Sequence, residues 1–316
     1  MKYLVTGGAG FIGSNLIECL LERGEDIICI DNFDTFYDPS IKRKNISKAL
    51  LKNEHFVLYE GDIRDKAIVK KIFNEHSIDT VIHLAARAGV RPSLIDSQLY
   101  YDVNVMGTLN ILENMQIANV TKMLFASSSS VYGNSSSVPF SETDPVAQPI
   151  SPYAATKRAG ELLCYTYSHL YKFDIWCMRF FTVYGHRQRP EMAISLFTNS
   201  IKNGQTIKMY GQGDTLRDYT YIDDIIGGIV KALDKLKGYE VINLGESRTI
   251  SLKDLVRTIE KHLGKKAIIV QLPEQLGDVR VTYANIEKAK KLFHYNPSTT
   301  VDEGIKKFVN WLQIDQ

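Results

Sequence analysis

The feature that most restricts the fold of this chain is a glycine-rich turn set between two hydrophobic segments. Residues 7–13 read Gly-Gly-Ala-Gly-Phe-Ile-Gly, after the strand-like run Tyr3–Thr6 and before a helical pattern over Ser14–Arg23. Glycines at this spacing permit a tight turn, let backbone N–H groups approach a phosphate and allow close packing of helix on strand. Because strand, spacing and helix agree, the segment predicts an anion-binding turn in a βαβ unit.

The rest of the first 180 residues alternates short apolar runs with helical patterns. The runs are mostly continuous, as expected for parallel strands that are buried on both faces, and the alternation implies right-handed crossovers. After Gly185, polar turns interrupt the chain and helical segments near 252–263 and 303–313 dominate. The predicted strands are Tyr3–Thr6, Ile27–Asp31, Phe56–Tyr59, Thr80–Leu84, Met123–Ser127, Ile175–Phe180 and Val241–Leu244.

These patterns predict an α/β protein with a doubly wound parallel Rossmann sheet and a smaller, interleaved C-terminal α/β lobe. A chain of 316 residues with 44% apolar side chains can bury a core of that size. We expect 1–185 to form the sheet domain, with 218–245 returning to it. The smaller lobe is expected to contain 186–217 and 246–316.

Composition limits the partners and the compartment. Lys and Arg total 38 against 36 for Asp and Glu, so we expect no nucleic acid as a partner. No apolar stretch is long enough to span a bilayer and the chain starts with a strand-like run, so a cytoplasmic protein with no membrane partner is expected. The cysteines form no C-x-x-C pair, which favours buried free thiols and no metal site: Cys19, Cys29, Cys164 and Cys177.

The second predicted strand ends at Asp31, which Asn32 follows. A carboxylate at this place can accept hydrogen bonds from a ribose diol and would repel a 2′-phosphate. No Arg or Lys follows until Lys42, so the sequence favours NAD over NADP. The turn 61–63, Gly-Asp-Ile, is a plausible adenine contact, with an ordinary helix-capping turn as the alternative.

A predicted helix opens at Ser151-Pro152 and places Tyr153 and Lys157 one turn apart on one face. Lowering the pKa of a phenol by about three units from its usual value near 10 requires roughly 4 kcal/mol, which a nearby ammonium and an oxidised nicotinamide can supply. The alternative is an ordinary surface helix. The serines of 127–130 end the fifth strand, where one could relay a proton, or could simply form a polar loop.

Together with His83-Leu84-Ala85-Ala86, these motifs resemble the extended short-chain dehydrogenase/reductase family along nearly the whole chain, and in particular its nucleotide-sugar members. The resemblance implies NAD as cofactor, a UDP-sugar as substrate, Tyr153 as base, Lys157 as its tuner and Ser128 as hydroxyl partner. It also implies that 1–185 binds NAD and that the smaller lobe binds the nucleotide sugar. The implied cofactor contacts are Gly7, Gly10, Phe11, Ile12, Gly13, Asp31, Asn32, Asp62, Ile63, Leu84, Ala85, Ala86, Asn104, Tyr153 and Lys157.

The resemblance also bears on the reaction. Related sugar dehydratases carry an Asp-Glu pair where this chain has Ser129-Ser130, and related decarboxylases carry Glu at the place of Ser130. Elimination of water needs an acid and a base beyond the tyrosine, so inversion at the sugar C4 by oxidation and re-reduction is favoured. Segment 179–193 resembles UDP-glucuronate 4-epimerases, whereas galactose epimerases usually have Asn at Thr182. A 4-epimerase of UDP-glucose or UDP-N-acetylglucosamine, a decarboxylase and a non-catalytic dinucleotide-binding protein remain alternatives.

Arginines account for most of the expected substrate contacts. Arg189 could hold a sugar carboxylate through a two-pronged ion pair, unless it makes surface or dimer contacts. By resemblance, Arg217 contacts the diphosphate, Arg280 is a weaker candidate for the same duty, and 206–210 lines uracil. The expected substrate-binding residues are Ser128, Ser129, Thr182, Arg189, Arg217, Arg280 and Arg91. A homodimer is expected through helices near 98–117 and 153–172, with apolar residues Leu99, Val103, Leu109, Leu112, Leu163 and Leu170.

Overall fold

The computed structural model describes residues 1–51, 54–135, 137–273 and 279–314. It divides into two compact units. The first unit contains residues 1–133, 145–180 and 229–242, and the second contains 134–144, 181–228 and 243–316. The chain passes between the units more than once, so they are interleaved in sequence.

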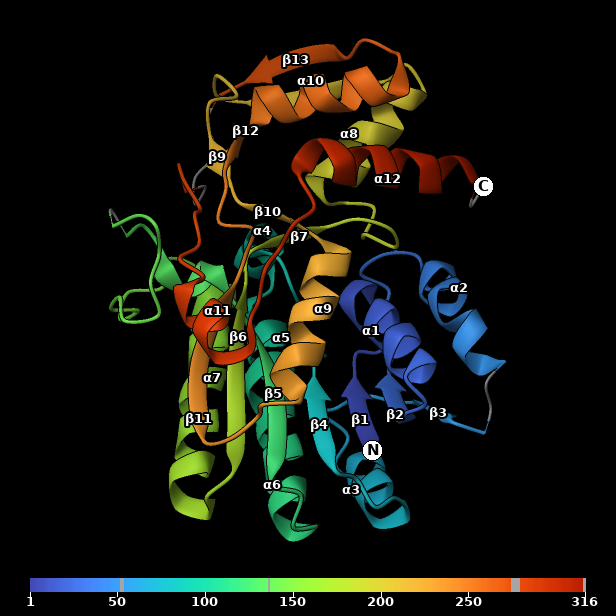
Figure 1. The fold of residues 1–316 in the computed structure, drawn as a ribbon, viewed down its shortest axis with the longest axis vertical. Helices are drawn as coiled ribbons and strands as arrows, with labels where there is room; N and C mark the ends of the chain where they lie inside the picture. The colour runs from blue at the N-terminus through green and yellow to red at the C-terminus, as the bar shows by residue number, and fades with distance from the viewer. Residues whose placement is uncertain (52–53, 136, 274–278, 315–316) are drawn as a thin grey trace. The chain divides into compact units, whose positions relative to one another are not determined.

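The first unit is built on a seven-stranded sheet in the order β3-β2-β1-β4-β5-β6-β11 (Figure 1). Every pairing from β3 across to β6 is parallel. The strand order reverses between β1 and β4, and ligands of doubly wound sheets bind beyond the carboxyl ends of the strands at this reversal. The predicted doubly wound sheet is confirmed. Its strands are β1 Lys2–Thr6, β2 Asp26–Asp31, β3 Phe56–Glu60, β4 Thr80–His83, β5 Lys122–Ser128, β6 Asp174–Phe180 and β11 Tyr239–Leu244.

Helices of the first unit cover the sheet, and α6 contacts both α3 and α7. Side chains from these three helices form one hydrophobic cluster with the strands, including Phe73, Ile111 and Cys164 packed with Val81 and Phe125. The helices are α1 Phe11–Glu22, α2 Pro39–Leu50, α3 Lys66–Glu75, α4 Val90–Ile95, α5 Ser97–Tyr101, α6 Thr108–Ile117 and α7 Pro152–Tyr171; a π-helical turn, Asp102–Gly107, joins α5 to α6, and a 3-10 turn, Ser129–Tyr132, follows β5.

Local sequence explains where α7 begins and how closely it packs. The Ser151 side chain caps the helix by accepting the Ala154 N–H at 3.1 Å, and Pro152 occupies the first turn. At Gly160 a Cβ atom would lie 2.4 Å from the ring of Phe125, so only glycine lets α7 approach β5 this closely. The helix that carries Tyr153 is therefore fixed against the middle of the sheet.

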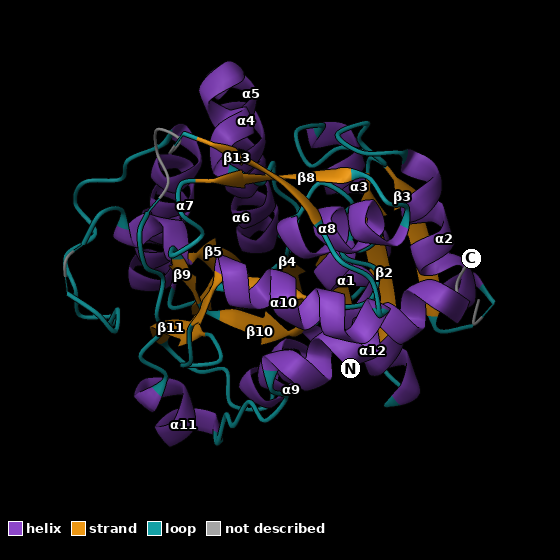
Figure 2. Ribbon diagram, turned by 90° about the horizontal axis from the view of Figure 1, so that it is seen from above, coloured by secondary structure: helices purple, strands orange, loops and turns teal. Residues whose placement is uncertain are grey.

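The second unit combines helices with three two-stranded sheets, which pair β10 with β7, β12 with β9 and β13 with β8. Helix α10 contacts both α8 and α12 (Figure 2). The elements are β7 Thr182–Tyr184, α8 Ala193–Lys202, β8 Thr206–Tyr210, β9 Leu216–Arg217, β10 Tyr219–Tyr221, β12 Ile250–Ser251, α10 Leu252–Leu263, β13 Ile268–Leu272, α11 Glu287–Phe293 and α12 Val301–Ile314. Helix α9, Ile222–Leu233, begins in the second unit and ends in the first.

The unit boundaries differ from the expected domains in four segments, 134–144, 181–185, 218–228 and 243–245, all of which belong to the second unit. Residues 134–144 belong to the second unit because Phe140 forms a β-bridge with Ala284. Residues 218–228 belong there too, because the buried carboxylate of Asp218 accepts hydrogen bonds from the N–H groups of Glu246 and Ala284. The segment that returns to the sheet unit is therefore 229–242.

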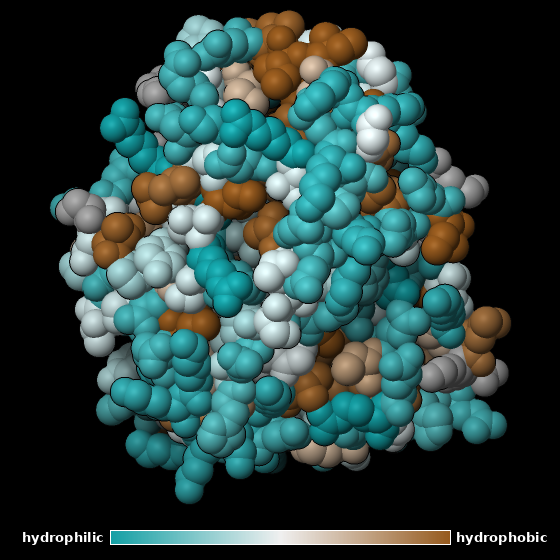
Figure 3. All heavy atoms as spheres, turned by 45° about the horizontal axis from the view of Figure 1, so that its top comes forward, coloured by the Kyte–Doolittle hydropathy of each residue, from teal (hydrophilic) through white to brown (hydrophobic). Residues whose placement is uncertain are grey.

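Polar side chains cover most of the face shown in Figure 3, and apolar side chains gather at its top. Strand β13 lies at the top of Figure 1 and exposes Ile268, Ile269 and Val270 to about half of their areas, 55%, 45% and 47%. Within the described residues, no helix combines the length and the apolar character that crossing a membrane would need.

Candidate active site

The glycine turn forms a cradle at the carboxyl end of β1. Gly7 has a φ of +70°, and a Cβ there would lie 2.7 Å from the backbone N of Ala85. A Cβ at Gly13 would lie 2.4 Å from the Gly7 carbonyl oxygen, so the helix start must approach the turn without a side chain. Gly10 caps α1 without a side-chain hydrogen bond, and the first turn holds no acidic residue. The N-terminal N–H groups of α1 therefore suit a pyrophosphate.

Asp31 ties the end of β2 to this turn. It is 7% exposed, and its two carboxylate oxygens accept the N–H of Ala9 at 3.0 Å and of Phe33 at 2.9 Å. Burial raises the pKa of Asp31, and these hydrogen bonds and Lys42 oppose the rise. Each oxygen can accept a further hydrogen bond, so the geometry is compatible with the expected ribose contact.

Asn32, Asp62 and Ile63 come together beyond the ends of β2 and β3. The Asn32 amide donates to Asp62 at 2.9 Å, and the Arg64 guanidinium binds the same carboxylate at 2.8 and 2.9 Å. Burial works against ionisation of Asp62, but Arg64 and Asn32 outweigh it and hold its pKa below the usual value. Ile63 is buried, and a Cβ at Gly107 would lie 2.5 Å from its side chain. Sequence reasoning missed Arg64, although it stands only two residues after Asp62.

The segment after β4 is bound to β1. The N–H groups of Leu84 and Ala85 donate to the carbonyl and the hydroxyl of Thr6, both at 3.1 Å. His83 lies between the hydroxyls of Thr6 and Thr108 at 2.7 and 2.9 Å. Burial, with the nearby Lys157 charge, lowers the pKa of His83 to about 3, so its ring stays neutral. The structure thus joins the predicted segment 84–86 to the glycine turn.

Asn104 lies in the π-helical turn, a type of distortion that is frequent at functional sites. Its amide binds both the N–H and the carbonyl of Arg87, at 2.8 and 3.0 Å, and donates to the Thr156 hydroxyl at 3.0 Å. Thr156 stands on α7 between Tyr153 and Lys157. Asn104 therefore anchors the loop after β4 to the helix that carries the predicted base, and a direct cofactor contact stays a prediction.

Lys157 is 4% exposed, and its ammonium donates to the carbonyl of Ala126 on β5 at 2.7 Å. Burial lowers the pKa of Lys157 to about 8, and the charge of Glu161 is among the effects that oppose the shift. Lys157 is thus mainly protonated at neutral pH. One turn earlier on α7, the Tyr153 ring meets the Tyr100 ring edge to face, with centroids 6.2 Å apart.

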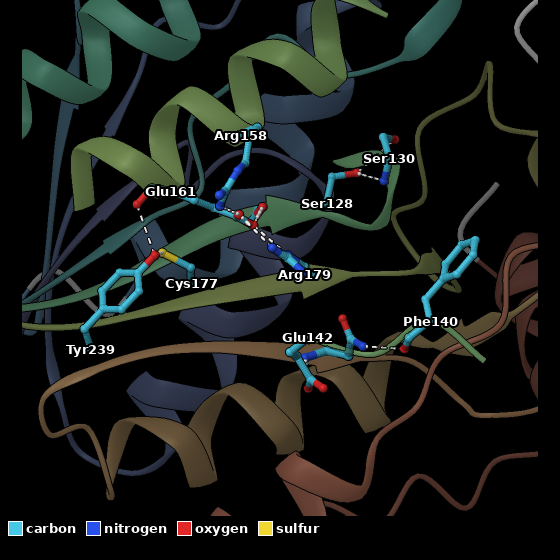
Figure 4. Close-up of polar contacts among 11 residues, drawn as sticks. Ser128, Ser130, Phe140, Glu142, Arg158, Glu161, Cys177, Arg179 and Tyr239 are labelled. Atoms are coloured by element: carbon cyan, nitrogen blue, oxygen red, sulfur yellow. Dashed lines mark hydrogen bonds and ion pairs between the residues drawn. The ribbon is translucent and has the colours of Figure 1, made fainter. Parts of the chain in front are cut away.

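Ser128 is the last residue of β5, two positions after the carbonyl that Lys157 binds. Its hydroxyl donates to the Ser130 hydroxyl at 3.1 Å and accepts the Ser130 N–H at 3.2 Å (Figure 4). Ser129 opens the following 3-10 turn and is partly buried. Lys157 is therefore bonded to β5 two residues before Ser128, and the catalytic roles of both residues stay predictions. No group of three or more His, Cys, Asp or Glu that could hold a metal ion occurs in the described part of the chain.

In the second unit, the structure brings the segments of Arg217 and Arg280 together. The Arg217 guanidinium donates to the Arg280 carbonyl at 3.3 Å, although Arg280 itself is exposed. Thr182 opens β7, and Arg189 forms an ion pair with Glu191 at 2.8 Å. Arg91 is an exposed residue of α4 in the first unit.

Sequence reasoning also missed a buried ionic cluster beside the site. The Glu161 carboxylate is fully buried and binds the Arg179 guanidinium at 2.8 and 2.9 Å. Burial works against the Glu161 charge, but Arg179, Ser127 and Arg158 outweigh it and lower the pKa. The available signal was the position of Glu161 four residues after Lys157, on the same helical face.

A doubly wound sheet with a glycine cradle and a helix that carries Tyr153 and Lys157 define an extended short-chain dehydrogenase/reductase. The GDP-mannose 4,6 dehydratase family matches residues 4–308, and the chain belongs to this family.

Several similar curated relatives and solved structures are 4-epimerases of UDP-sugars. The chain is 47% identical to a UDP-glucuronate 4-epimerase of Thermodesulfobacterium geofontis, over 98% of this chain and 95% of that protein. It is 43% identical to UDP-glucuronate 4-epimerase 1 of Arabidopsis thaliana, over 98% and 76%. A Bacillus cereus UDP-glucuronic acid 4-epimerase, in complex with UDP-glucuronic acid and NAD, matches with a TM-score of 0.93 and 36% identity over the whole of both chains. A Thermotoga maritima UDP-glucose 4-epimerase matches with a TM-score of 0.92 and 31% identity, over 100% of this chain and 99% of that chain.

Proposed function

We propose that this protein is an NAD-dependent 4-epimerase that interconverts UDP-glucuronate and UDP-galacturonate through a 4-keto sugar. The observation that carries the proposal is the placement of Lys157, which is buried one turn after Tyr153 and bonded to β5 two residues before Ser128. The similarity to UDP-glucuronate 4-epimerases along 98% of the chain supports the substrate. Segment 1–185, with 218–245 returning to it, would bind NAD, and 186–217 with 246–316 would bind the nucleotide sugar.

Each of the proposed catalytic residues has a separate role in the reaction. NAD, when bound, supplies a reversible electron acceptor for the C4 alcohol. Tyr153 takes the proton of the C4 hydroxyl as the alcohol becomes a ketone, and it returns a proton to the C4 oxygen after the sugar has turned. The Lys157 ammonium favours the phenolate form of Tyr153, and the Ser128 hydroxyl relays the proton between sugar and phenolate.

Hydroxyl groups at the end of β5 favour epimerisation over elimination. Ser129 and Ser130 stand where related dehydratases carry acidic residues, and Ser130 is hydrogen bonded to Ser128. Hydroxyls at this place supply no second acid and base. UDP-glucose is the second candidate substrate, because the Thermotoga maritima UDP-glucose 4-epimerase has nearly the same fold.

Substrate selection is proposed to rest on Arg189. In this loop the Arg189 guanidinium forms an ion pair with the Glu191 carboxylate at 2.8 Å. A uronate carboxylate would take the place of Glu191 or share the guanidinium with it, since a planar guanidinium can bind carboxylates at two edges. Arg217 and Arg280 would bind the diphosphate from their neighbouring segments, and Thr182 and Arg91 would contact the sugar.

Tyr153→Phe tests the proposed base. Because general acid–base catalysis typically contributes 10²- to 10⁴-fold, kcat for UDP-glucuronate should fall by about 10³-fold while NAD still binds. Chromatography of the UDP-sugars measures conversion, and calorimetry measures NAD binding. Turnover at the wild-type rate would exclude Tyr153 as the base.

Arg189→Ala tests the substrate. Loss of a charged hydrogen-bonded pair costs about 1.5–3 kcal/mol, so kcat/KM for UDP-glucuronate should fall about 10- to 100-fold while activity on UDP-glucose changes little. Arg187→Ala, two positions earlier in the same loop, is the matched control. Equal losses on both sugars would remove the carboxylate contact from the proposal.

We also propose a homodimer formed through the helices of 98–117 and 153–172. Four of the expected interface residues pack within the first unit instead. Val103 and Leu112 lie in its hydrophobic core, and Leu99 and Leu163 pack against that core. Exposed apolar residues on these two segments include Met106, Leu162, Tyr165 and Leu170, whose side chains are 53%, 51%, 52% and 61% exposed, together with Tyr101, Ile117 and Tyr171. Leu162→Glu should yield monomers in sedimentation velocity, and a monomeric wild-type protein would contradict the proposal.

A cytoplasmic location, without a nucleic-acid partner, completes the proposal. It is supported by four free cysteines, of which Cys29, Cys164 and Cys177 are buried, since free thiols are typical of proteins in reducing compartments. Cell fractionation tests it, and recovery of the protein outside the cytoplasm would contradict it.

A further inference from the structure

We infer that Glu161 is a positioning residue for this reaction: its carboxylate joins α7 to the ends of β5 and β6, and thereby fixes Lys157 relative to Ser128. The inference rests on the proposed function, because it assigns Lys157 and Ser128 the roles given above. Glu161 itself is buried and touches neither reacting group of the proposed mechanism.

One carboxylate binds side chains from three elements (Figure 4). One oxygen of Glu161 accepts the Ser127 hydroxyl of β5 at 2.6 Å and the Arg179 Nε of β6 at 2.8 Å. The other oxygen accepts Arg179 Nη2 and, from α7 itself, Arg158 Nη1, both at 2.9 Å. Ser127 and Arg179 are direct partners in the β5–β6 register. The carboxylate therefore spans two neighbouring strands at a single level of the sheet.

This junction is continuous with the proposed catalytic groups. Tyr153, Lys157 and Glu161 follow one another at intervals of four on α7, so they share one face of the helix. Lys157 binds the carbonyl of Ala126, and Glu161 binds the next residue, Ser127. Two successive turns of α7 are thus bonded to two successive residues of β5, and the following residue is Ser128. A displacement of about 1 Å between reacting groups can cost as much as 100-fold in rate.

Burial of this ion pair is better explained by positioning than by stability. Glu161 and Arg179 are 0% and 2% exposed, and removing two charges from water usually costs about as much as their attraction returns. Two parallel hydrogen bonds between a guanidinium and a carboxylate do, however, fix a direction as well as a distance. The Arg179 guanidinium also lies over the Tyr132 ring, 4.8 Å from its centroid, which links the turn after Ser128 to the same cluster.

Ser127→Ala removes the bond to β5 and leaves every charge of the cluster in place. We expect kcat for UDP-glucuronate to fall about tenfold with KM within about twofold, because the variant misplaces the reacting groups without touching the substrate-binding residues. Tyr239→Phe is the matched control. It removes a hydrogen bond to the backbone carbonyl of Glu161, 3.1 Å long, and leaves the carboxylate untouched, so its kcat should equal that of the wild type.

Unchanged kcat in Ser127→Ala, or an equal loss in Tyr239→Phe, would overturn the inference. Thermal unfolding of each variant corrects both rates for the folded fraction. Crystal structures of the wild type and of Ser127→Ala provide a readout without substrate: loss of the bond between Lys157 Nζ and the Ala126 carbonyl supports the inference, and an unchanged bond overturns it. If the wild type converts no UDP-sugar, the proposed function fails. The two crystal structures still show whether the Glu161 cluster holds Lys157 in place.

Discussion

Each unit of the molecule contains a buried glutamate, and the pKa values of the two carboxyl groups are shifted in opposite directions. Glu161 in the first unit is 0% exposed and is bound by Arg179, Arg158 and Ser127. Glu246 in the second unit is 4% exposed, and neither of its carboxyl oxygens accepts a hydrogen bond within the described residues. Its nearest ion-pair partner is 3.9 Å away. The pKa of Glu161 lies below its usual value, whereas burial and neighbouring acids raise that of Glu246 to about 7.

The difference shows that the partners, more than the burial, set the charge of a buried acid. The guanidinium groups of Arg179 and Arg158 favour the ionised form of Glu161 and hold its pKa below the usual value despite burial. Asp218, in the second unit, is an intermediate case. Burial raises its pKa to about 6, although it accepts backbone N–H groups from Glu246, Ser247 and Ala284. Backbone dipoles therefore compensate a buried charge less completely than a guanidinium does.

Of the substitutions that test this comparison, Glu161→Gln should have the largest effect on the free energy of unfolding. The amide keeps the shape of the side chain but leaves the Arg179 guanidinium buried without a counter-charge, so the free energy of unfolding should fall by about 3–5 kcal/mol. Denaturant titration at neutral pH measures it. Glu246→Gln is the control, because it leaves no cation buried and should not destabilise the protein. Equal stabilities of Glu161→Gln and wild type would show that the buried Arg179 guanidinium does not need Glu161 as its counter-charge.

Asp218→Asn should have a smaller effect on the second unit. The amide group of asparagine offers one acceptor oxygen where Asp218 now uses both oxygens to hold Glu246, Ser247 and Ala284. Leaving buried N–H groups unpaired costs about 1–3 kcal/mol, so the unfolding free energy should fall by about 2 kcal/mol. Hydrogen exchange at residues 246, 247 and 284 provides the local measurement. Unaltered protection there would show that water or the amide replaces the carboxylate.

The same contrast explains what the sequence could predict. The glycine turn, the apolar runs and the pair Tyr153 and Lys157 are local patterns, so they identified the sheet and the helix that carries the proposed base. Glu161 was missed because its partner Arg179 is 18 positions away and the pair becomes recognisable only when β5 and β6 align. Asp218 was missed for another reason. Its partners are backbone N–H groups, which any residue supplies, and for the same reason the unit boundary near 218–228 could not be placed.

Glu246→Gln should give the smallest effect on the free energy of unfolding, and the size of this effect depends on pH. The folded-state pKa of Glu246, about 7, lies above the ordinary value of 4.5, so the folded protein holds this proton more tightly than the unfolded chain. The stability that the protonated carboxyl provides is complete below pH 4.5 and is lost as the pH rises towards 7. The full shift from 4.5 to about 7 would correspond to roughly 3 kcal/mol, which solvent screening reduces. The variant should therefore match the wild type near pH 4.5 and exceed it at pH 8 by on the order of 1 kcal/mol.

Denaturant titrations of wild type and variant across this pH range give the difference directly. The control is Glu22→Gln, at an exposed position of α1, which should leave the pH dependence unchanged. The pKa of Asp218 is raised as well, so the wild type keeps part of its pH dependence, and only the difference between the two proteins reports on Glu246. A difference that stays constant from acid to alkaline pH would mean that a partner of Glu246, such as Arg248, compensates the charge as Arg179 does for Glu161.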